Sequence, residues 1–458
     1  MTATHLEIVV VGAGLGGLAA AIALSLHGHK VTLLEAAPAL GEIGAGIQIP
    51  PNSTAVLKLL GVYDKIKEVV VWPNAINMVS YRDGEILGPA PLNPYVEKAY
   101  GSPYWVIHRA DYHSILHSRA KEVGVNILVD QRVISIDESI PSVTTAAGKY
   151  SSGNTYRTDL VIAADGIKSF IRSIIFPDLT DEIIESDSSA YRAVIPAEHM
   201  KDDPELNELL INPTARSWIG PGGHIMCYPI RNGTLYNVVM LHPAQDEVGG
   251  IWNTPATTEE MLTTYQDWDP TVKKIIRKID SAMKWKVCYL AEIPNWQSSS
   301  GKVVLLGDSA HATVPFLAQG AAMAMEDAIA LAECLDYVTE TKDMSNLLKV
   351  YEIVRKPRCT RVVLGSKEMG YINHLSDGPK QEARDYALRH QSRINDVEPD
   401  RYIPSASTEV PPFELKNPNP WNDTVFEPWL FGYDVLKVIR AQLHLSAKNP
   451  ISEQNRDL

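Results

Sequence analysis

The stretch IVVVGAGLGG at residues 8–17 is an apolar run that ends in a cluster of glycines. Gly12, Gly14 and Gly17 have the spacing G-x-G-x-x-G. In a dinucleotide-binding turn, the first glycine allows the tight turn, the second lets the backbone approach a pyrophosphate, and the third lets the helix pack on its strand. The helix N-terminus then attracts the phosphates. The pattern predicts a strand, a turn and a helix, with either a dinucleotide site or a tight turn that binds no ligand.

A second apolar run, HKVTLLEAA at residues 29–37, contains an acidic residue about 20 positions past the glycine turn. Glu35 therefore stands where such a domain binds the ribose hydroxyls. An acid there suits a free 2′-hydroxyl, which favours FAD or NAD over NADP. We predict that Glu35 and its neighbour Ala36 border the nucleotide. A glycine-rich loop follows, and Gly46 at its end permits a close approach of backbone to ligand.

The composition is that of an ordinary globular protein of 458 residues, long enough for two or three domains. The net charge of −13 argues against a nucleic-acid partner. The four cysteines are scattered without metal-ligand spacing, so we expect no metal site and a reducing compartment. Residues 8–26 are apolar, but no positive segment precedes them and the glycine turn interrupts them. We therefore expect no signal peptide or membrane span, and a cytoplasmic location.

The chain changes pattern in its middle third. The segments SAYRAVIP, SWIGPGGHIMCYPI and TLYNVVMLHP predict antiparallel strands. We assign residues 1–180 and 298–375 to a discontinuous nucleotide-binding domain, residues 181–297 to a β-sheet substrate domain, and residues 376–458 to a C-terminal extension.

Outside these strands, local patterns predict several further elements. Residues 76–87 are expected to form a hairpin that turns at Asp83–Gly84. A long helix is expected at residues 345–370. Beyond residue 373 the chain becomes polar and proline-rich, which predicts an extended arm with a late helix near residues 434–443.

Further residues are candidates for contacts to the same ligand as the glycine turn. Arg109 in HRADYH can bind a ribityl or phosphate oxygen, or it is a surface arginine before a helix. Asp165 in AADG can face the nucleotide or cap a helix. Asp308 in LLGDSAH ends a strand and can accept bonds from ribityl hydroxyls, or it too is a cap. The N–H groups near Gly320 and Ala321 can face the pyrimidine carbonyl of a flavin.

Taken together, these motifs resemble the group A flavoprotein aromatic hydroxylases. The resemblance rests on GAGLGG, Glu35, Arg109, AADG and GDSAHATVPFLAQGAAMAMEDA, and it covers about residues 6 to 375. The salicylate-hydroxylase-like FAD monooxygenases, including fungal enzymes of secondary metabolism, are the most similar. The resemblance implies an α/β fold with an α+β insertion: a Rossmann-like FAD-binding domain of the 4-hydroxybenzoate hydroxylase type, a β-sheet substrate domain and C-terminal helices.

The resemblance also implies the chemistry. FAD is the bound cofactor and NAD(P)H the transient reductant, and Pro315 matches the proline beside the flavin ring. A C4a-hydroperoxyflavin formed with O₂ would hydroxylate or epoxidise an electron-rich aromatic, such as a phenol, a salicylate-like acid or an indole alkaloid. The alternative is a flavoprotein oxidoreductase of the same fold that inserts no oxygen. Either a monomer or a homodimer is compatible with the sequence.

Three side chains of the predicted sheet domain are candidates for catalysis. Arg192 matches an arginine with which related enzymes hold a phenolate or donate a proton; the alternative is an internal salt bridge, because an unpaired buried charge is costly. His224 and Tyr228 are four residues apart in one strand, so they face the same way. A tyrosine can bind or deprotonate a substrate hydroxyl, and a histidine titrates near neutral pH. The alternative for His224 is a structural role.

Overall fold

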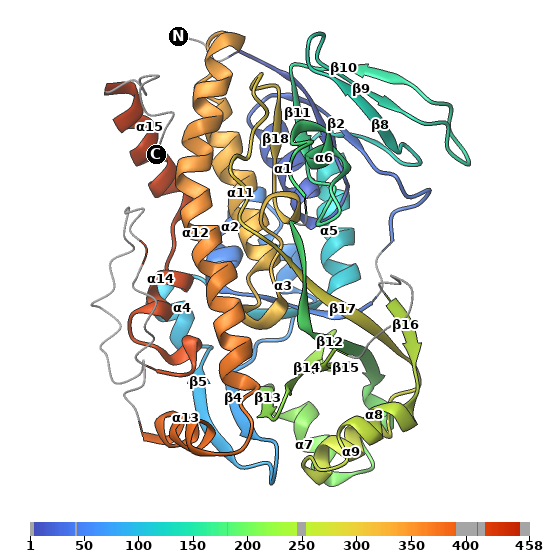
Figure 1. The fold of residues 1–458 in the computed structure, drawn as a ribbon, viewed down its shortest axis with the longest axis vertical. Helices are drawn as coiled ribbons and strands as arrows, with labels where there is room; N and C mark the ends of the chain where they lie inside the picture. The colour runs from blue at the N-terminus through green and yellow to red at the C-terminus, as the bar shows by residue number, and fades with distance from the viewer. Residues whose placement is uncertain are drawn as a thin grey trace.

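The computed structural model describes residues 4–41, 44–180, 182–244, 253–390, 410 and 417–448. Two main sheets occupy the two halves of the molecule, and one long helix runs beside both (Figure 1). Within these residues, no helix has the length and apolar character needed to cross a membrane. Most of the predicted proline-rich arm, at residues 391–409 and 411–416, lies outside the described residues.

The first sheet contains five parallel strands in the order β18-β11-β1-β2-β7. Its strands are β1 Glu7–Val11, β2 Lys30–Leu34, β7 Asn126–Leu128, β11 Leu160–Ala163 and β18 Val303–Leu305. Parallel strands need crossover connections, and helices supply them. Helix α1 (Leu15–Leu26) contacts both α5 (Arg109–Glu122) and α11 (Gly320–Leu335). The strand, turn and helix predicted from the glycine stretch are confirmed.

Smaller elements complete this half. They are the antiparallel pair β3 (Gly46–Ile49) and β6 (Trp105–His108), and the small sheet of β8 (Val133–Asp137), β9 (Ser142–Thr145) and β10 (Thr155–Arg157). The shorter helices are α2 Pro51–Leu60, α3 Tyr63–Lys67, α4 Tyr95–Tyr100, α6 Phe170–Ile175 and α10 Asp308–His311. The backbone N–H of Gly46 donates to Oδ1 of Asn237 at 2.7 Å. This bond fastens β3 to the second sheet.

The second sheet contains eight strands in the order β16-β17-β12-β15-β14-β13-β4-β5. They are β4 Ala75–Ser80, β5 Ile86–Pro91, β12 Ile183–Pro196, β13 Ala215–Gly220, β14 Gly223–Ile230, β15 Leu235–Pro243, β16 Asn253–Ala256 and β17 Ala282–Leu290. Neighbouring strands are antiparallel, except that β13 and β4 are parallel. In Figure 1 this sheet occupies the lower half, beside α7 (Pro204–Ile211), α8 (Thr258–Thr264) and α9 (Pro270–Ile276).

The hairpin predicted at residues 76–87 is confirmed as β4 and β5. Its place in the fold differs from the predicted division of the chain, because it extends the eight-stranded sheet. Ala215 of β13 pairs with Ile76 of β4. The sheet is therefore built from residues 75–91 as well as from the predicted insertion. A pairing between distant segments leaves no local sequence signal, which is why the pattern alone did not indicate it.

The two faces of the second sheet have different roles, because successive side chains in a strand point to opposite faces. Ile225 and Cys227 of β14 pack in a hydrophobic cluster with residues of α7, α8 and α9. Arg192, His224 and Tyr228 face the other side and line a cavity. The alternation predicted for His224 and Tyr228 is therefore confirmed.

The C-terminal helices lie along one side of the molecule (Figure 1). Helix α12 (Met344–Asn373) confirms the predicted long helix and is slightly longer at both ends. It is followed by α13 (Pro379–His390), α14 (Phe426–Phe431) and α15 (Val435–Lys448). Helix α15 confirms the predicted late helix and packs on α11 and α12.

Candidate active site

A cavity of about 360 Å³, called the inner cavity here, lies between the two sheets. Most of the residues predicted for the site line it: Gly14, Gly17, Gly46, Arg109, Arg192, His224, Tyr228, Asp308, Pro315, Gly320 and Ala321. Gly12, Glu35, Ala36 and Asp165 are not among its lining residues. The fold thus brings together residues from both sheets and from segments far apart in the chain.

The geometry of the turn shows why glycines stand at positions 12, 14 and 17. A Cβ atom on Gly17 would lie 1.9 Å from the carbonyl oxygen of Gly12, and one on Gly12 would lie 2.4 Å from that of Ala164. Gly12 also has a φ of +100°, which disfavours other residues. By contrast, a Cβ on Gly14 would meet nothing within 4 Å. Gly12 and Gly17 are therefore needed for packing, whereas Gly14 keeps space open at the cavity.

Glu35 lies directly behind this turn. Its carboxylate accepts hydrogen bonds from the backbone N–H groups of Ala13 and Ala37, each at 2.8 Å. These bonds hold the glycine turn and the end of β2 together. A contact of Glu35 or Ala36 with a ribose stays a prediction.

Two helices begin at the inner cavity without a side-chain cap. Gly14 is the N-cap residue of α1, and Gln319 is that of α11; neither provides a side-chain hydrogen bond to its helix. The first N–H groups of a helix need partners and attract negative charge. Asp308 and Gly320 border the same space. This part of the cavity is thus suited to a ligand with phosphate or carbonyl oxygens and with hydroxyl groups.

Asp165 makes contacts that match the capping alternative. Its side chain accepts hydrogen bonds from the Ser169 hydroxyl at 2.6 Å and from the Ile171 N–H at 3.2 Å, so it holds the start of α6. Burial raises the pKa of this carboxyl group. A contact of Asp165 with the nucleotide stays a prediction.

Two arginines make one wall of the cavity positive. Arg109 is the first residue of α5, and its N–H is bonded to the Ala45 carbonyl at 2.8 Å. Arg192 extends from β12, and within the described part of the chain its buried Nε has no hydrogen-bond acceptor. Burial lowers the pKa of Arg192, and the charge of Arg109 lowers it further. The predicted alternative was an internal salt bridge of Arg192, but no carboxylate of the described residues is among the groups that shift its pKa. The wall is therefore suited to an anionic ligand.

Tyr228 and His224 lie on the same sheet face as Arg192. Burial raises the pKa of Tyr228, although the nearby Arg192 opposes the shift, so the phenol is protonated at neutral pH. Tyr228 can therefore donate a hydrogen bond there. His224 is buried, and its Nδ1 lies 2.8 Å from Nε2 of His374. It thus has a structural partner and also lines the cavity.

A sequence profile of the FAD binding domain family matches residues 5–366. The chain belongs to this family. It is 34% identical over 435 residues to the FAD-dependent monooxygenase OpS4 of Beauveria bassiana, covering 94% of this chain and 96% of that protein. It is 36% identical over 374 residues to the 3-hydroxybenzoate 6-hydroxylase of Polaromonas naphthalenivorans, covering 81% and 88%. A salicylate hydroxylase substrate complex matches with a TM-score of 0.73 and 25% identity, covering 96% of this chain and 98% of that one.

The resemblance inferred from the motifs is thereby confirmed, and the chain is an FAD-dependent monooxygenase. Its residues fit the cofactor. The open space at Gly14 and the two uncapped helix ends suit a pyrophosphate and a flavin carbonyl, and Arg109 adds positive charge. The individual contacts to FAD stay predictions.

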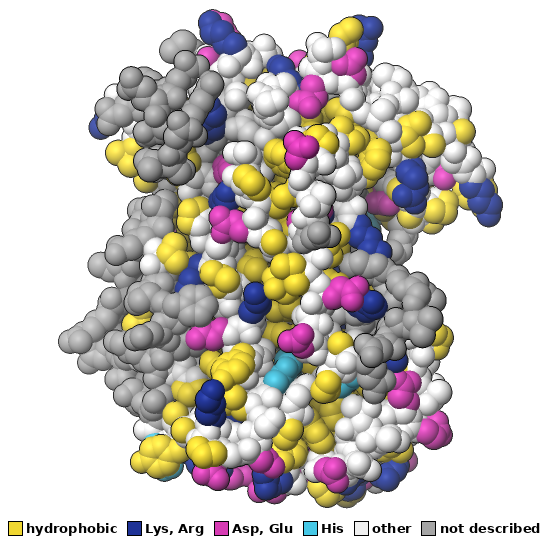
Figure 2. All heavy atoms as spheres, in the orientation of Figure 1, with side chains coloured by type: hydrophobic (Ala, Val, Ile, Leu, Met, Phe, Trp, Pro, Cys, Tyr) yellow, Lys and Arg dark blue, Asp and Glu magenta, His cyan; other side chains and the backbone are white. Residues whose placement is uncertain are grey.

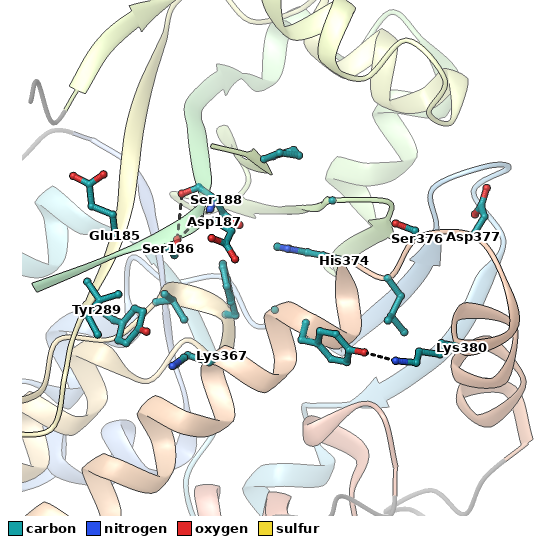
Figure 3. A pocket seen from close by; sticks show the side chains of 18 of the residues that line it. Glu185, Ser186, Asp187, Ser188, Tyr289, Lys367, His374, Ser376, Asp377 and Lys380 are labelled. Atoms are coloured by element: carbon teal, nitrogen blue, oxygen red, sulfur yellow. Dashed lines mark hydrogen bonds between the residues drawn. The ribbon is translucent and has the colours of Figure 1, made fainter. Parts of the chain in front are cut away.

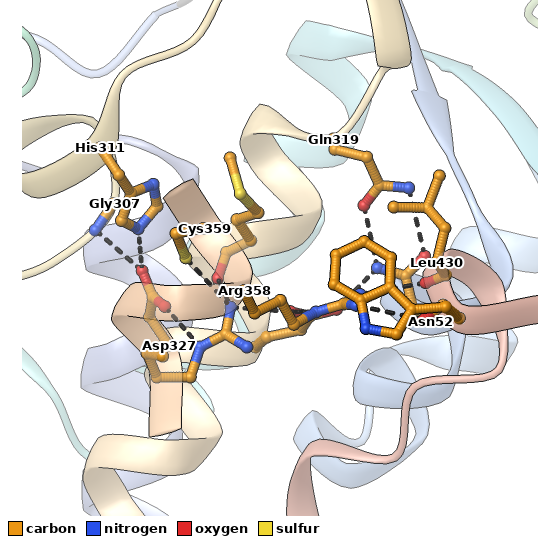
Figure 4. A network of polar contacts seen from close by, with 12 residues as sticks. Asn52, Gly307, His311, Gln319, Asp327, Arg358, Cys359 and Leu430 are labelled. Carbon is orange, nitrogen blue, oxygen red and sulfur yellow. Dashed lines mark hydrogen bonds and ion pairs between the residues drawn. The ribbon is translucent and has the colours of Figure 1, made fainter. Parts of the chain in front are cut away.

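A buried ionic network supports the cofactor side of the monooxygenase (Figure 4). Glu326 and Asp327 of α11 pair with Arg355 and Arg358 of α12 at 2.7 to 2.8 Å. Asp327 also accepts hydrogen bonds from His311, at 2.6 Å, and from the N–H of residue 307, at 3.1 Å. These bonds fix the strand end that carries the predicted ribityl contact. His311 is therefore a structural residue, as its position in the motif indicates.

The same network reaches the C-terminal segment. Arg358 donates to the carbonyls of Trp429 and Leu430, at 3.2 and 3.0 Å. Asn52 donates to Gln319 at 3.0 Å and to Glu326 at 2.7 Å. The loop before α11 is thus tied to α2 and to the C-terminal helices.

Several lining residues of the monooxygenase were missed by sequence reasoning. Gln48 lines the inner cavity and accepts a hydrogen bond from the Tyr104 hydroxyl at 2.7 Å. Phe316 follows Pro315 and lines the cavity as well. Trp421, from the C-terminal segment, is 1% exposed, and its indole N–H has no acceptor among the residues that the structure places. Only Phe316 lies in a recognised motif; nothing local marks the other two.

Proposed function

We propose that this monooxygenase uses NAD(P)H and O₂ to hydroxylate an electron-rich aromatic that carries an ionisable hydroxyl or a carboxylate. The observation that carries the proposal is Arg192, whose buried Nε has no acceptor among the described residues and whose side chain lines the inner cavity. A buried cation without a partner is costly, and an anionic ligand removes that cost. Arg109 adds a second positive charge on the same side.

The other lining residues support the same substrate class. The Tyr228 hydroxyl can donate to a substrate oxygen, and His224 can accept a proton from it. Met226, Val239, Leu241 and Phe316 provide apolar surface for an aromatic ring and exclude water. When bound, FAD supplies the redox chemistry: it takes electrons from NAD(P)H and transfers one oxygen atom of O₂ to the substrate.

The names of two relatives agree with this substrate class. The Polaromonas protein is named for 3-hydroxybenzoate and the structural neighbour for salicylate, which are both hydroxylated aromatic acids. Other relatives are named only as FAD-dependent monooxygenases of fungi. Phenols, aromatic hydroxy acids and indoles all belong in the first substrate panel.

The test measures NADH and NADPH oxidation by the FAD-loaded protein with 3-hydroxybenzoate, salicylate, phenol and indole. A substrate should stimulate oxidation and yield a product heavier by one oxygen atom. Arg192→Gln should raise the KM for an acidic substrate about 10- to 100-fold, the range expected for one lost charged hydrogen bond. Bound FAD should be unchanged.

Arg216→Gln is the matched control. Arg216 lies on β13 of the same sheet, opposite Cys227 on the helix-covered face, and does not line the inner cavity. The Arg216→Gln variant should leave the KM for the acidic substrate unchanged. An unchanged KM for the acidic substrate in Arg192→Gln would contradict the placement of the anionic group. A product without added oxygen would instead favour an oxidoreductase of the same fold.

A further inference from the structure

A second cavity, of about 910 Å³, adjoins the inner cavity and is called the outer cleft here. It is lined by residues 184–188 of β12, by the end of α12 and by residues 375–380. Figure 3 shows His374 extending from the end of α12 toward Ser186, Asp187 and Ser188. On the face drawn in Figure 2, histidine atoms reach the surface in the lower half, among hydrophobic and acidic side chains.

Phe316 and two histidines form the wall between the two cavities. Phe316 lines both cavities, His224 lines only the inner one and His374 only the outer one. The Phe316 ring lies edge-on to both imidazoles, with ring centroids 5.1 Å from His224 and 5.6 Å from His374. The phenyl ring of Phe316 has no polar atom, so it cannot pass a proton between the cavities. A hydrogen bond between His224 Nδ1 and His374 Nε2, 2.8 Å long, provides a polar connection through this wall.

The end of α12 is fastened to the second sheet beside the two histidines, and burial affects both imidazoles. The carbonyl of His374 accepts a hydrogen bond from the N–H of Gly222 at 3.0 Å, next to the start of β14. Burial lowers the pKa of His374 to about 4 and lowers that of His224 well below its ordinary value. Both imidazoles are then neutral at pH 7, and a neutral imidazole has one N–H donor and one acceptor nitrogen. Such a ring can accept a proton at one nitrogen while releasing one from the other.

We propose that His224 and His374 form a proton relay between the inner cavity and the outer cleft. The proposal rests on the proposed function for its proton source, a substrate hydroxyl. That proton moves to Nε2 of His224, the Nδ1 proton of His224 moves to Nε2 of His374, and the Nδ1 proton of His374 moves to water in the outer cleft. Each ring gains one proton and loses one. Both stay neutral in the other tautomer, and the negative charge stays on the substrate oxygen near Arg192.

Charged and titratable groups lie on both sides of the relay. On the inner side they are Arg109, Arg192, Tyr228 and Asp308. On the outer side they are Glu185 and Asp187 of β12, Tyr289 of β17, Lys367 and Tyr371 of α12, and Asp377 and Lys380 beyond it. The two arginines on the inner side stabilise the anion that remains. The outer side contains carboxylates that can receive the released proton.

The test begins with His374→Gln in the FAD-loaded protein. Glutamine can accept the hydrogen bond of His224 but cannot pass a proton on. With the phenolic probe that stimulates the wild type best, kcat should fall at least about tenfold, since general acid–base steps contribute about 10²–10⁴-fold, while KM stays similar. The solvent deuterium isotope effect on kcat should rise.

Chemical rescue provides a second readout. In His374→Ala, imidazole can enter from the outer cleft, and it should restore at least several-fold of the lost kcat. His242→Ala is the matched control, because His242 is a buried histidine of β15 that lines neither cavity. Imidazole should not change its rate. If His374→Gln turns over normally, or if imidazole restores nothing, the relay is wrong.

Nitrogen-15 NMR of histidine-labelled protein separates failure of the relay from failure of the proposed function, because it needs no substrate. At pH 7 both rings should be neutral and joined by one hydrogen bond, and His374→Gln should shift the signals of His224. Charged rings or unchanged His224 signals would overturn the relay. If no phenol stimulates NAD(P)H oxidation in the wild type, the proposed function fails, and the NMR result still decides whether the paired tautomers exist.

Discussion

The cofactor half and the substrate half of this monooxygenase present their functional groups in different ways. Around the five-stranded sheet, the site consists largely of backbone: glycines that allow close approach and helix N-termini at α1 and α11. On the eight-stranded sheet, it consists of side chains that stand on one face of β12 and β14. Backbone sites depend on residue spacing within a short stretch. Side-chain sites depend on which strands pair.

The two halves also differ in how their buried charges are compensated. In the cofactor half, the buried charges of α11 and α12 neutralise one another, and Arg355 and Asp327 are fully buried as a pair at 2.8 Å. In the substrate half, Arg192 has no carboxylate partner among the residues described, and the His224–His374 pair is kept neutral by burial. Paired buried charges offset one another's desolvation cost, whereas an unpaired buried charge is available to a ligand.

The largest expected effect tests the backbone side of the comparison. Gly17→Ala places a Cβ 1.9 Å from the Gly12 carbonyl oxygen, within a strand-to-helix turn that cannot move aside. It should lower the free energy of unfolding by about 3 kcal/mol or more, as severe overpacking does, and abolish FAD binding. Urea unfolding of the apoprotein and FAD titration measure the two effects.

Gly14→Ala is the matched variant for that experiment. Its Cβ meets nothing within 4 Å, so the apoprotein should keep its stability within about 1 kcal/mol. FAD affinity should still fall, about tenfold or more, because the methyl group occupies the space for the pyrophosphate. Equal stability losses in both variants would show that Gly14 serves packing as well, and the distinction between them would be lost.

A somewhat smaller effect tests the substrate half through its pH dependence. Burial holds the pKa of folded His374 at about 4, below its unfolded value of about 6.5. Above pH 6.5 both states are neutral at this ring. As the pH falls from about 6.5 to about 4, the unfolded chain binds a proton that the folded chain does not, so stability is lost over this window. His374 alone should contribute a loss of up to about 3 kcal/mol.

The measurement is urea unfolding at a series of pH values. His374→Gln should flatten the slope between pH 6.5 and 4, because the variant has one fewer group that gains a proton on unfolding. The same change at His5, which is exposed, is the control and should leave the slope as it is. An unchanged slope in His374→Gln would mean that this ring is already protonated or solvated in the folded state.

The comparison explains how much could be predicted from the sequence. The glycine turn, the strand ending before Asp308 and the start of α11 are local patterns, and the structure confirms them as strand, turn and helix. Strand alternation correctly placed His224 and Tyr228 on one face. The pairing of β4 with β13 could not be predicted, because strand pairing between distant segments depends on the whole fold. His374 was missed for the same reason.

Trp421 carries the smallest expected effect, and it tests whether a C-terminal segment without any recognised motif contributes to the substrate half. Its indole N–H is buried at the inner cavity without an acceptor among the described residues. Trp421→Phe keeps most of the ring and removes this donor. If the N–H binds the substrate, the KM for the phenolic probe should rise about three- to tenfold, the range for one neutral hydrogen bond, while stability stays the same or increases slightly.

Trp296→Phe provides the contrast, because Trp296 is equally buried but packs against His311 and Tyr351 away from the inner cavity. That change should lower stability and leave KM unaltered. The opposite pattern, with stability lost in Trp421→Phe and KM unchanged, would make Trp421 a packing residue and restrict the substrate contacts to the eight-stranded sheet and the loop at Pro315.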